Sequence, residues 1–283
     1  MNRVPATPAR RHLGAVGPIR HKGGTSIADP PMQSFSSNGV SLSYLDEGEG
    51  PPILLIHGFS SSMKVNWINP GWVDTLVKAG RRVIAFDNRG HGASDKPHDV
   101  AAYRVAVMAE DARNLLNHLD IARADVMGYS MGARIATILA LTHPAMVKSL
   151  ILGGLGYGIV TGVGPWGPVV DALRSEEPET ITDPVGLMFR KFADQTRSDR
   201  VALAACMQAT RQPISADDLA TLRVPTLIAV GEKDEIAGSA ADLAAIIPGA
   251  EVLDIPKRDH MLAVGDKVYK AGVLEFLARR GLG

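Results

Sequence analysis

The chain has 283 residues, enough for one large α/β domain, or two small ones, with a sizeable core. Its 30 Lys and Arg residues balance its 30 Asp and Glu residues, so the overall charge favours neither nucleic acid nor an anionic membrane as a partner. No apolar run approaches the length of a membrane span. The single cysteine, Cys206, excludes an internal disulfide framework and fits a reducing compartment, so we expect a soluble, cytoplasmic protein.

Residues 1–31 differ in composition from the rest of the chain. Arginines and a lysine stand there among prolines and glycines, and the first acidic residue is Asp29. Arg10 and Arg11 resemble a twin-arginine export signal, but glycine, proline and charge interrupt the apolar stretch that such a signal needs. We interpret residues 1–31 as a disordered basic leader, an extension from an upstream start, and expect the folded domain to begin at Met32.

From Met32 onward, strands and helices are predicted in alternation. Asn38 and Gly39 interrupt an alternating apolar and polar stretch, which is typical of a two-residue hairpin turn. Short apolar runs then alternate with segments of helical periodicity. Strands are expected at 33–36, 40–45, 52–56, 82–86, 124–129, 147–152, 225–230 and 251–255. Helices are expected at 67–79, 104–119, 131–142, 238–247 and 267–279. This order predicts the α/β class, with a mostly parallel, doubly wound sheet after an antiparallel hairpin.

The alternation stops between the strands at 147–152 and 225–230. A glycine-rich stretch is followed there by helical patterns at 169–175, 184–192 and 198–208. We predict that residues 154–213 form a helical cap over the carboxyl ends of the strands, and that residues 32–153 and 214–283 form the core. Three apolar residues of this segment are candidates for a substrate pocket, although apolar side chains in such helices are more often simply packing. They are Trp166, Met188 and Phe189.

The pentapeptide Gly128-Tyr129-Ser130-Met131-Gly132 has the pattern G-x-S-x-G between a predicted strand and a predicted helix. A serine hydroxyl is a poor nucleophile until a sharp turn exposes it to a histidine that can take its proton. The two glycines lack the Cβ atoms that would collide where strand and helix cross. Ser130 is therefore a candidate nucleophile.

A nucleophilic serine also needs a base and an acid that orients the base. In an open parallel sheet, functional groups gather in the loops after the carboxyl ends of the strands. The strand at 225–230 is followed by Asp234, and the strand at 251–255 is followed by Asp259 and His260. Serine, acid and histidine thus follow one another in the chain order of this architecture.

These motifs resemble those of serine hydrolases of the α/β-hydrolase fold, carboxylesterases in particular. The resemblance extends from about Met32 to the C-terminus and includes the His-Gly segment at 57–58 and the Asp-x-Arg-Gly-x-Gly-x-Ser segment at 87–94. It implies that Ser130 is the nucleophile, His260 the general base and Asp234 the acid. It also implies that the backbone N–H groups of Phe59 and Met131 form the oxyanion hole.

Other acids lie close to the expected position of the triad carboxylate. Glu232 and Glu235 are alternatives to Asp234, whose spacing after Gly231 matches the family. Some relatives carry the acid after the preceding strand, but the loop at 153–158 contains no carboxylate. Asp259 is adjacent to His260 and is expected to shape its loop.

The resemblance is specific for the fold and weak on the substrate. Relatives that open epoxides or displace halide carry aspartate at the nucleophile position, so Ser130 favours acyl transfer. We expect hydrolysis of a small-molecule carboxylic ester or lactone by water. The alternatives are cleavage of a carbon-carbon bond in a vinylogous diketone, and a binding or receptor protein that retains the triad. Amide hydrolysis, acyl transfer to another alcohol and perhydrolysis stay open.

No cofactor or metal is expected. The histidines pair with no second ligand at metal-site spacing. The G-x-G-x-x-G pattern at 162–167 lies at the entrance to the predicted cap and not at the first strand-to-helix turn, where a dinucleotide site requires it. The expected partners are therefore a small ester-like substrate and water. The sequence does not indicate the oligomeric state.

Overall fold

The computed structural model describes residues 32–162 and 164–280, so the predicted leader at 1–31 lies outside the described residues. An eight-stranded sheet has the order β1-β2-β4-β3-β5-β6-β7-β8. Its strands are β1 Gln33–Ser37, β2 Val40–Glu47, β3 Pro52–Ile56, β4 Arg82–Phe86, β5 Ala124–Tyr129, β6 Val147–Gly153, β7 Thr226–Gly231 and β8 Glu251–Ile255. The β2 strand pairs antiparallel with β1 and β4, and all other pairs are parallel. The predicted fold class is confirmed.

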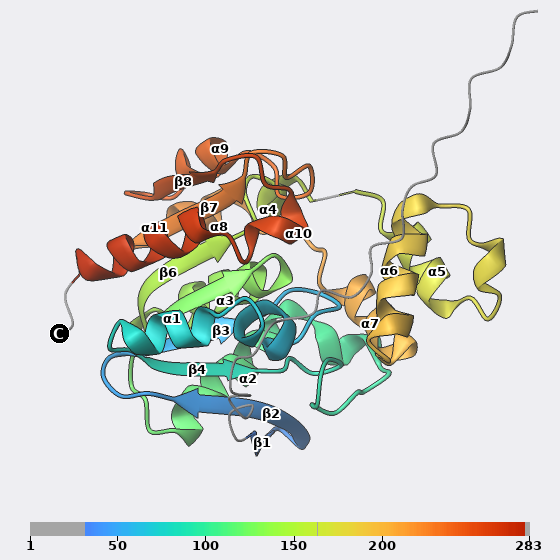
Figure 1. Cartoon of the computed structure of the whole chain (residues 1–283), viewed down its shortest axis with the longest axis horizontal. Helices are drawn as coiled ribbons and strands as arrows, with labels where there is room; N and C mark the ends of the chain where they lie inside the picture. Colours follow the sequence, from blue (N-terminus) through green and yellow to red (C-terminus); the bar gives the residue numbers. More distant parts are fainter. Residues whose placement is uncertain (1–31, 163, 281–283) are drawn as a thin grey trace, which may run out of the picture. The chain divides into compact units, whose positions relative to one another are not determined.

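Helices cover the sheet and follow most of its strands (Figure 1). They are α1 Trp72–Lys78, α2 Val105–His118, α3 Met131–Thr142, α4 Gly158–Thr161, α5 Gly167–Arg174, α6 Pro184–Gln195, α7 Arg200–Ala209, α8 Ala216–Ala220, α9 Ala240–Ala244, α10 His260–Ala263 and α11 Lys267–Ala278. Short turns of other helix types occur at Lys64–Ile68, Val100–Tyr103, Pro144–Met146 and Pro178–Thr180. None of the described helices is long and apolar enough for a membrane crossing.

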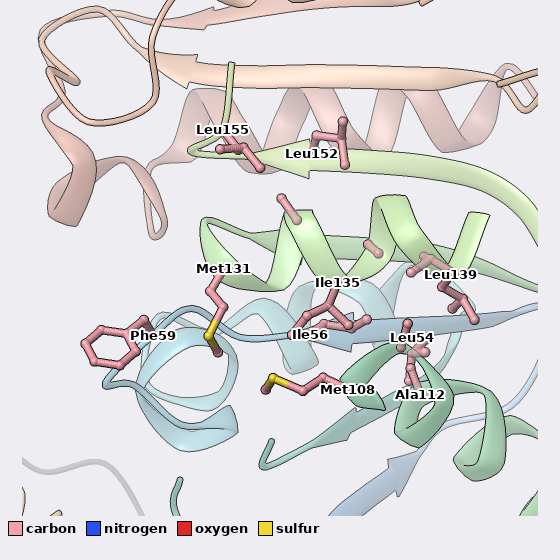
Figure 2. Close-up of a cluster of buried hydrophobic side chains, with 14 of the residues drawn as sticks. Leu54, Ile56, Phe59, Met108, Ala112, Met131, Ile135, Leu139, Leu152 and Leu155 are labelled. Carbon is pink, nitrogen blue, oxygen red and sulfur yellow. The ribbon is translucent and has the colours of Figure 1, made fainter. Parts of the chain in front are cut away.

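The two faces of the sheet bury separate hydrophobic clusters. On one face, residues of α1 and α11 such as Trp72 and Phe276 pack against strand residues such as Leu55. On the other face, α2, α3 and α9 cover the sheet. Figure 2 shows Met131 and Ile135 of α3 directed toward Ile56 of β3 and Met108 of α2. The helix that begins beside Ser130 is therefore held firmly on the sheet.

The N-terminal hairpin follows from its turn residues. Asn38 and Gly39 have φ values of 50° and 82°, the left-handed backbone that a two-residue hairpin turn needs. Asparagine and glycine tolerate this conformation better than other residues. The β1 strand pairs with β2 from Ser37 and Val40 outward, as the sequence pattern predicts.

The helix expected at 67–79 begins later than predicted. It starts at Trp72, and a π-helical turn at Lys64–Ile68 precedes it. Pro70 and Gly71 separate the two, and Gly71 has a φ of 78°, which a continuous helix does not allow. Both parts of the predicted segment are helical, but Pro70 and Gly71 interrupt the backbone and divide it into the π-helical turn and α1.

The helices α4–α8 lie between β6 and β7 in the chain, and Figure 1 shows α5, α6 and α7 grouped together at one end of the sheet. Aspartate side chains begin two of them: Asp183 accepts the Gly186 amide at the start of α6, and Asp199 accepts the Ala202 amide at the start of α7. On α6, Arg190 pairs with Asp194 at 2.8 Å. The insertion is thus an ordered set of helices that begins where β6 ends.

Candidate active site

Ser130 occupies a strained turn between β5 and α3. Its φ is 54° and its ψ is −112°, outside the regions that a serine normally adopts. The turn requires glycine on both sides: a Cβ on Gly128 would lie 2.2 Å from the carbonyl oxygen of Gly132, and a Cβ on Gly132 would lie 2.0 Å from that of Ile56. The close crossing of strand and helix thereby lifts the Ser130 side chain out of the sheet edge.

Ser130, His260 and Asp234 form one chain of hydrogen bonds. The Oγ of Ser130 lies 3.0 Å from Nε2 of His260, and Nδ1 of His260 lies 2.8 Å from Oδ2 of Asp234. The Asp234 side chain is fully buried, whereas the His260 side chain is 12% exposed. The three residues come from loops that are up to 130 positions apart in the chain. The structure therefore brings together the three side chains that the sequence singled out.

The loop after β7 fixes the Asp234 carboxylate. Its second oxygen, Oδ1, accepts the backbone N–H groups of Ile236 and Ala237, both at 2.9 Å. Glu232, one of the alternative acids, instead accepts the backbone N–H of Lys257 at 2.7 Å. Glu235 has no hydrogen bond to His260. Asp234 is the carboxylate that contacts the imidazole.

The loop after β8 holds His260 at the start of α10. Oδ1 of Asp259 accepts the backbone N–H groups of Met261 and Leu262, which caps this short helix. The hydroxyl of Tyr129 donates a 2.5 Å hydrogen bond to the carbonyl oxygen of His260. Tyr129 was not predicted as a site residue, because a tyrosine inside the G-x-S-x-G pattern does not by itself indicate such a contact.

The two amides predicted to bind an oxyanion lie at the ends of neighbouring segments. Met131 is the first residue of α3, where a backbone N–H has no partner inside the helix. Phe59 follows β3 in a turn. Within residues 32–162 and 164–280, neither amide donates to a backbone or side-chain acceptor. Both N–H groups are thus available to a ligand.

Buried side chains hold the turn that contains Phe59. Oδ1 of Asn66 accepts the Gly58 amide at 2.8 Å, and Nε2 of His91 accepts the Ser60 amide at 3.1 Å. Nε2 of His57 accepts the Asn88 amide at 2.9 Å. The amides on either side of Phe59 are therefore anchored. Asn66 was missed in the sequence because it lies in the π-helical turn, which has no recognisable pattern.

Both anchoring histidines act in the neutral form. Burial lowers the pKa of His57 to about 4, and burial together with the neighbouring His57 lowers the pKa of His91 to about 3. In each ring Nδ1 contacts a backbone carbonyl and Nε2 accepts an amide, an arrangement that suits a neutral imidazole. Protonation would turn these acceptors into donors.

A cavity of about 810 Å³ opens beside Ser130 and His260. Trp166, Met188 and Phe189, which were predicted as pocket residues, all lie on its wall. The cavity wall also includes Phe192 and Arg211, which the sequence did not reveal. Arg211 belongs to a polar stretch after α7 that resembles an ordinary surface loop, so only the folded chain places it here.

The family model described as the alpha/beta hydrolase fold matches residues 51–173. An uncharacterized protein of Mycobacterium tuberculosis is 38% identical over 132 residues, which are 46% of this chain and 36% of that protein. The match therefore spans about a third of the length of this relative.

Two further relatives have named activities. The dihydrolipoyllysine-residue acetyltransferase component of the acetoin cleaving system of Pseudomonas putida is 32% identical over 263 residues, which are 86% of this chain and 68% of that protein. A 2-hydroxymuconate semialdehyde hydrolase of Pseudomonas sp. strain CF600 is 36% identical over 133 residues, which are 46% of each chain.

Solved structures share the fold over nearly their whole length. A hydrolase from Pseudomonas aeruginosa has a TM-score of 0.72 and 26% identity, covering 87% of this chain and 98% of its own. The enol-lactonase from Burkholderia xenovorans has a TM-score of 0.73 and 23% identity, covering 87% of this chain and 100% of its own. Together with the sheet order and the strained turn at Ser130, these likenesses show that the chain belongs to the α/β-hydrolase fold family.

Proposed function

We propose that this protein is a serine hydrolase that cleaves a small-molecule carboxylic ester or lactone through an acyl-serine intermediate. The observation that carries the proposal is the hydrogen-bond chain from Ser130 through His260 to Asp234, at 3.0 Å and 2.8 Å, beside a cavity of about 810 Å³. The strained backbone of Ser130 supports it, because such strain persists where it serves a function.

In the first half of the reaction, Oγ of Ser130 attacks the ester carbonyl carbon and its proton passes to Nε2 of His260. The carbonyl oxygen becomes an oxyanion and accepts hydrogen bonds from the Phe59 and Met131 amides. When the carbon-oxygen bond to the alcohol breaks, the same proton passes from Nε2 to the departing oxygen. Asp234 keeps the other proton on Nδ1 and stabilises the transient imidazolium.

In the second half, His260 takes a proton from water, and the resulting hydroxide attacks the acyl carbon. The carbon-oxygen bond to Ser130 breaks, Oγ recovers a proton from Nε2, and the carboxylic acid leaves. We propose that residues 154–213 act as a cap over this site, with Trp166, Met188 and Phe189 as part of the substrate pocket. A cytoplasmic location is supported by the single, buried cysteine.

The second candidate is a carbon-carbon bond hydrolase. It is favoured by the likeness to the 2-hydroxymuconate semialdehyde hydrolase, a protein with which this chain shares 36% identity over 133 residues. Such a reaction would use the same nucleophile, base and acid. A ring-fission dienone in the substrate panel separates the two candidates.

The proposal is tested by Ser130→Ala. Wild type should turn over members of a panel of p-nitrophenyl esters and lactones and be labelled at Ser130 by a fluorophosphonate. We expect Ser130→Ala to lower kcat by roughly 10,000-fold or more and to abolish labelling. The control is Ser36→Ala, an exposed serine on β1, which should retain both.

Three results would contradict the proposal. Wild-type rates in Ser130→Ala would show that another group is the nucleophile. Turnover of the dienone with negligible ester turnover would favour the carbon-carbon hydrolase, and tight saturable binding without turnover would favour a binding protein.

A further inference from the structure

Arg211 is a cation on the cavity wall for which the described residues provide no anionic partner. It follows α7 and is half-buried. Its Nε donates to Sδ of Met207 at 3.0 Å, a weak acceptor. Within the described part of the chain, its two terminal nitrogens have neither a hydrogen-bond acceptor nor a carboxylate within salt-bridge distance. By contrast, Arg190 of the same insertion is paired with Asp194.

Two aromatic rings lie against the Arg211 guanidinium. Its Cζ lies 4.2 Å from the centre of the Trp166 ring and 5.6 Å from that of Phe59. Phe189 contacts both of these rings, at centroid distances of 6.1 Å and 5.5 Å. Cation-π contacts hold a guanidinium without occupying the hydrogen atoms at its edge. The terminal N–H groups of Arg211 are thereby left available to a ligand.

A buried arginine near Arg211 strengthens the positive potential. Arg134, four residues after Ser130, is 2% exposed and donates to backbone carbonyls only, including that of Gln212 at 2.7 Å. Burial lowers the pKa of Arg134 to about 10, and burial together with the charge of Arg134 lowers that of Arg211 to about 10. Both side chains therefore remain positive at neutral pH.

The acids on the cavity wall do not neutralise Arg211. Asp266 pairs with Arg258 at 2.6 Å, and Asp259 accepts the amides at the start of α10. Glu235 is not within salt-bridge distance of Arg211. A desolvated cation without a counter-ion is costly, and a bound anion would offset that cost.

We propose that Arg211 binds a carboxylate group of the substrate, so that the preferred substrate is an ester bearing a free carboxylate. The planar guanidinium matches a carboxylate through two parallel N–H···O bonds. Phe59 both contacts Arg211 and contributes the predicted oxyanion amide, so the carboxylate would lie a short chain away from the scissile carbonyl. This inference rests on the proposed function, since it concerns the substrate of the same site.

The test uses ester pairs that differ only in a carboxylate. Monophenyl glutarate and monophenyl adipate are compared with phenyl pentanoate and phenyl hexanoate, and 3-carboxyphenyl butyrate with phenyl butyrate. We expect wild type to favour the carboxylate member of at least one pair in kcat/KM. Arg211→Met should lower that preference by roughly 10- to 100-fold, mainly through KM. Arg211→Lys should retain part of it.

The control is Arg174→Met, which removes an exposed cation of α5 whose side chain donates to Gln208 outside the cavity wall. It should leave the preference unchanged. The inference is wrong if wild type shows no carboxylate preference, or if Arg211→Met slows both members of each pair equally. Circular dichroism of the variants detects a folding defect. If Arg211→Met does not fold, the carboxylate preference of Arg211→Lys is compared with that of wild type instead.

A binding experiment separates this inference from the proposed function. In Ser130→Ala protein, monophenyl glutarate binding is measured by calorimetry with and without the Arg211→Met change. Binding at least about 10-fold weaker without Arg211 would support the carboxylate site even if wild type proved unable to hydrolyse esters. Equal binding would overturn the carboxylate site while leaving ester hydrolysis untouched.

Discussion

At the scale of single residues, the role of each residue in the candidate site depends on the hydrogen bonds that its side chain can make. Asp234 directs one oxygen to Nδ1 of His260 and the other to two backbone amides. This arrangement keeps Nδ1 protonated and leaves Nε2 free to accept the proton of Ser130. The acid thus acts through the tautomer and orientation of the imidazole.

Asp234→Asn should therefore impair turnover while leaving the geometry nearly intact. The amide can present its NH₂ group to the imidazole and favour the tautomer with Nε2 protonated, so we expect kcat to fall by roughly 10,000-fold. Steady-state kinetics on the best ester checks this. Glu232→Gln is the matched control and should keep wild-type activity, because Glu232 contacts the Lys257 amide. Equal activity of Asp234→Asn and wild type would assign the role to Glu235 or Glu232.

The two buried histidines predict a loss of stability in mild acid. The pKa values of His57 and His91 are about 4 and about 3 in the folded protein, below the ordinary value of 6.5. The unfolded chain therefore binds more protons as pH falls below 6.5, and stability decreases until the pH reaches the folded pKa values. We expect these two groups to lower the free energy of unfolding by roughly 4 kcal/mol between pH 7.5 and pH 5.

Urea unfolding at several pH values measures this loss, and NMR of the imidazole protons assigns it. In the folded protein both rings should stay neutral at pH 5. Titration of either ring near pH 6.5 in folded protein would contradict the account.

At the scale of elements, the crossing of β5 and α3 determines whether the serine turn can form. The Cβ of an alanine at position 132 would lie 2.0 Å from the carbonyl oxygen of Ile56, a backbone atom of the central strand β3. Neither element can move aside, because α3 is packed into the cluster that Figure 2 shows. Glycine is thus required at position 132 because β3 and α3 pack closely there, and not because of the backbone angles of Gly132 itself.

Gly132→Ala should therefore destabilise the protein by roughly 3 kcal/mol or more, although alanine normally favours a helix over glycine. Chemical denaturation followed by circular dichroism measures the change. Thr142→Ala, at the exposed end of the same helix, is the control and should stay within about 0.5 kcal/mol of wild type. A Gly132→Ala protein as stable as wild type would show that α3 can shift on the sheet.

At the scale of the whole molecule, the order of elements was predictable because each strand has a local signature. The runs at 52–56 and 82–86 are apolar on both faces, and the observed β3 and β4 have the same bounds. Helix ends were less predictable, as the late start of α1 and the bounds of α9, which is shorter than the helix expected at 238–247, illustrate. Their bounds depend on turn geometry and capping contacts with residues that the periodicity does not include.

Three candidate catalytic residues could be named from the sequence because parallel strands bring their following loops to one edge. Ser130, Asp234 and His260 each follow such a strand, and the structure joins them by hydrogen bonds. Their roles stay predictions until Ser130→Ala is measured. Arg211 and Asn66 follow no strand and belong to no motif, so nothing local distinguished them from surface residues.

The sequence by itself determined the α/β class, the antiparallel hairpin and the loops that carry the serine, the acid and the histidine. These depend on short-range chemistry: apolar runs, turn glycines and the position of polar residues after strands. Only the tertiary structure decided that Arg211 lies against Trp166 and Phe59 without a counter-ion among the described residues. That environment is produced by contacts between the segment after α7, the start of α5 and the loop after β3, which are far apart in the chain, and no local pattern encodes them.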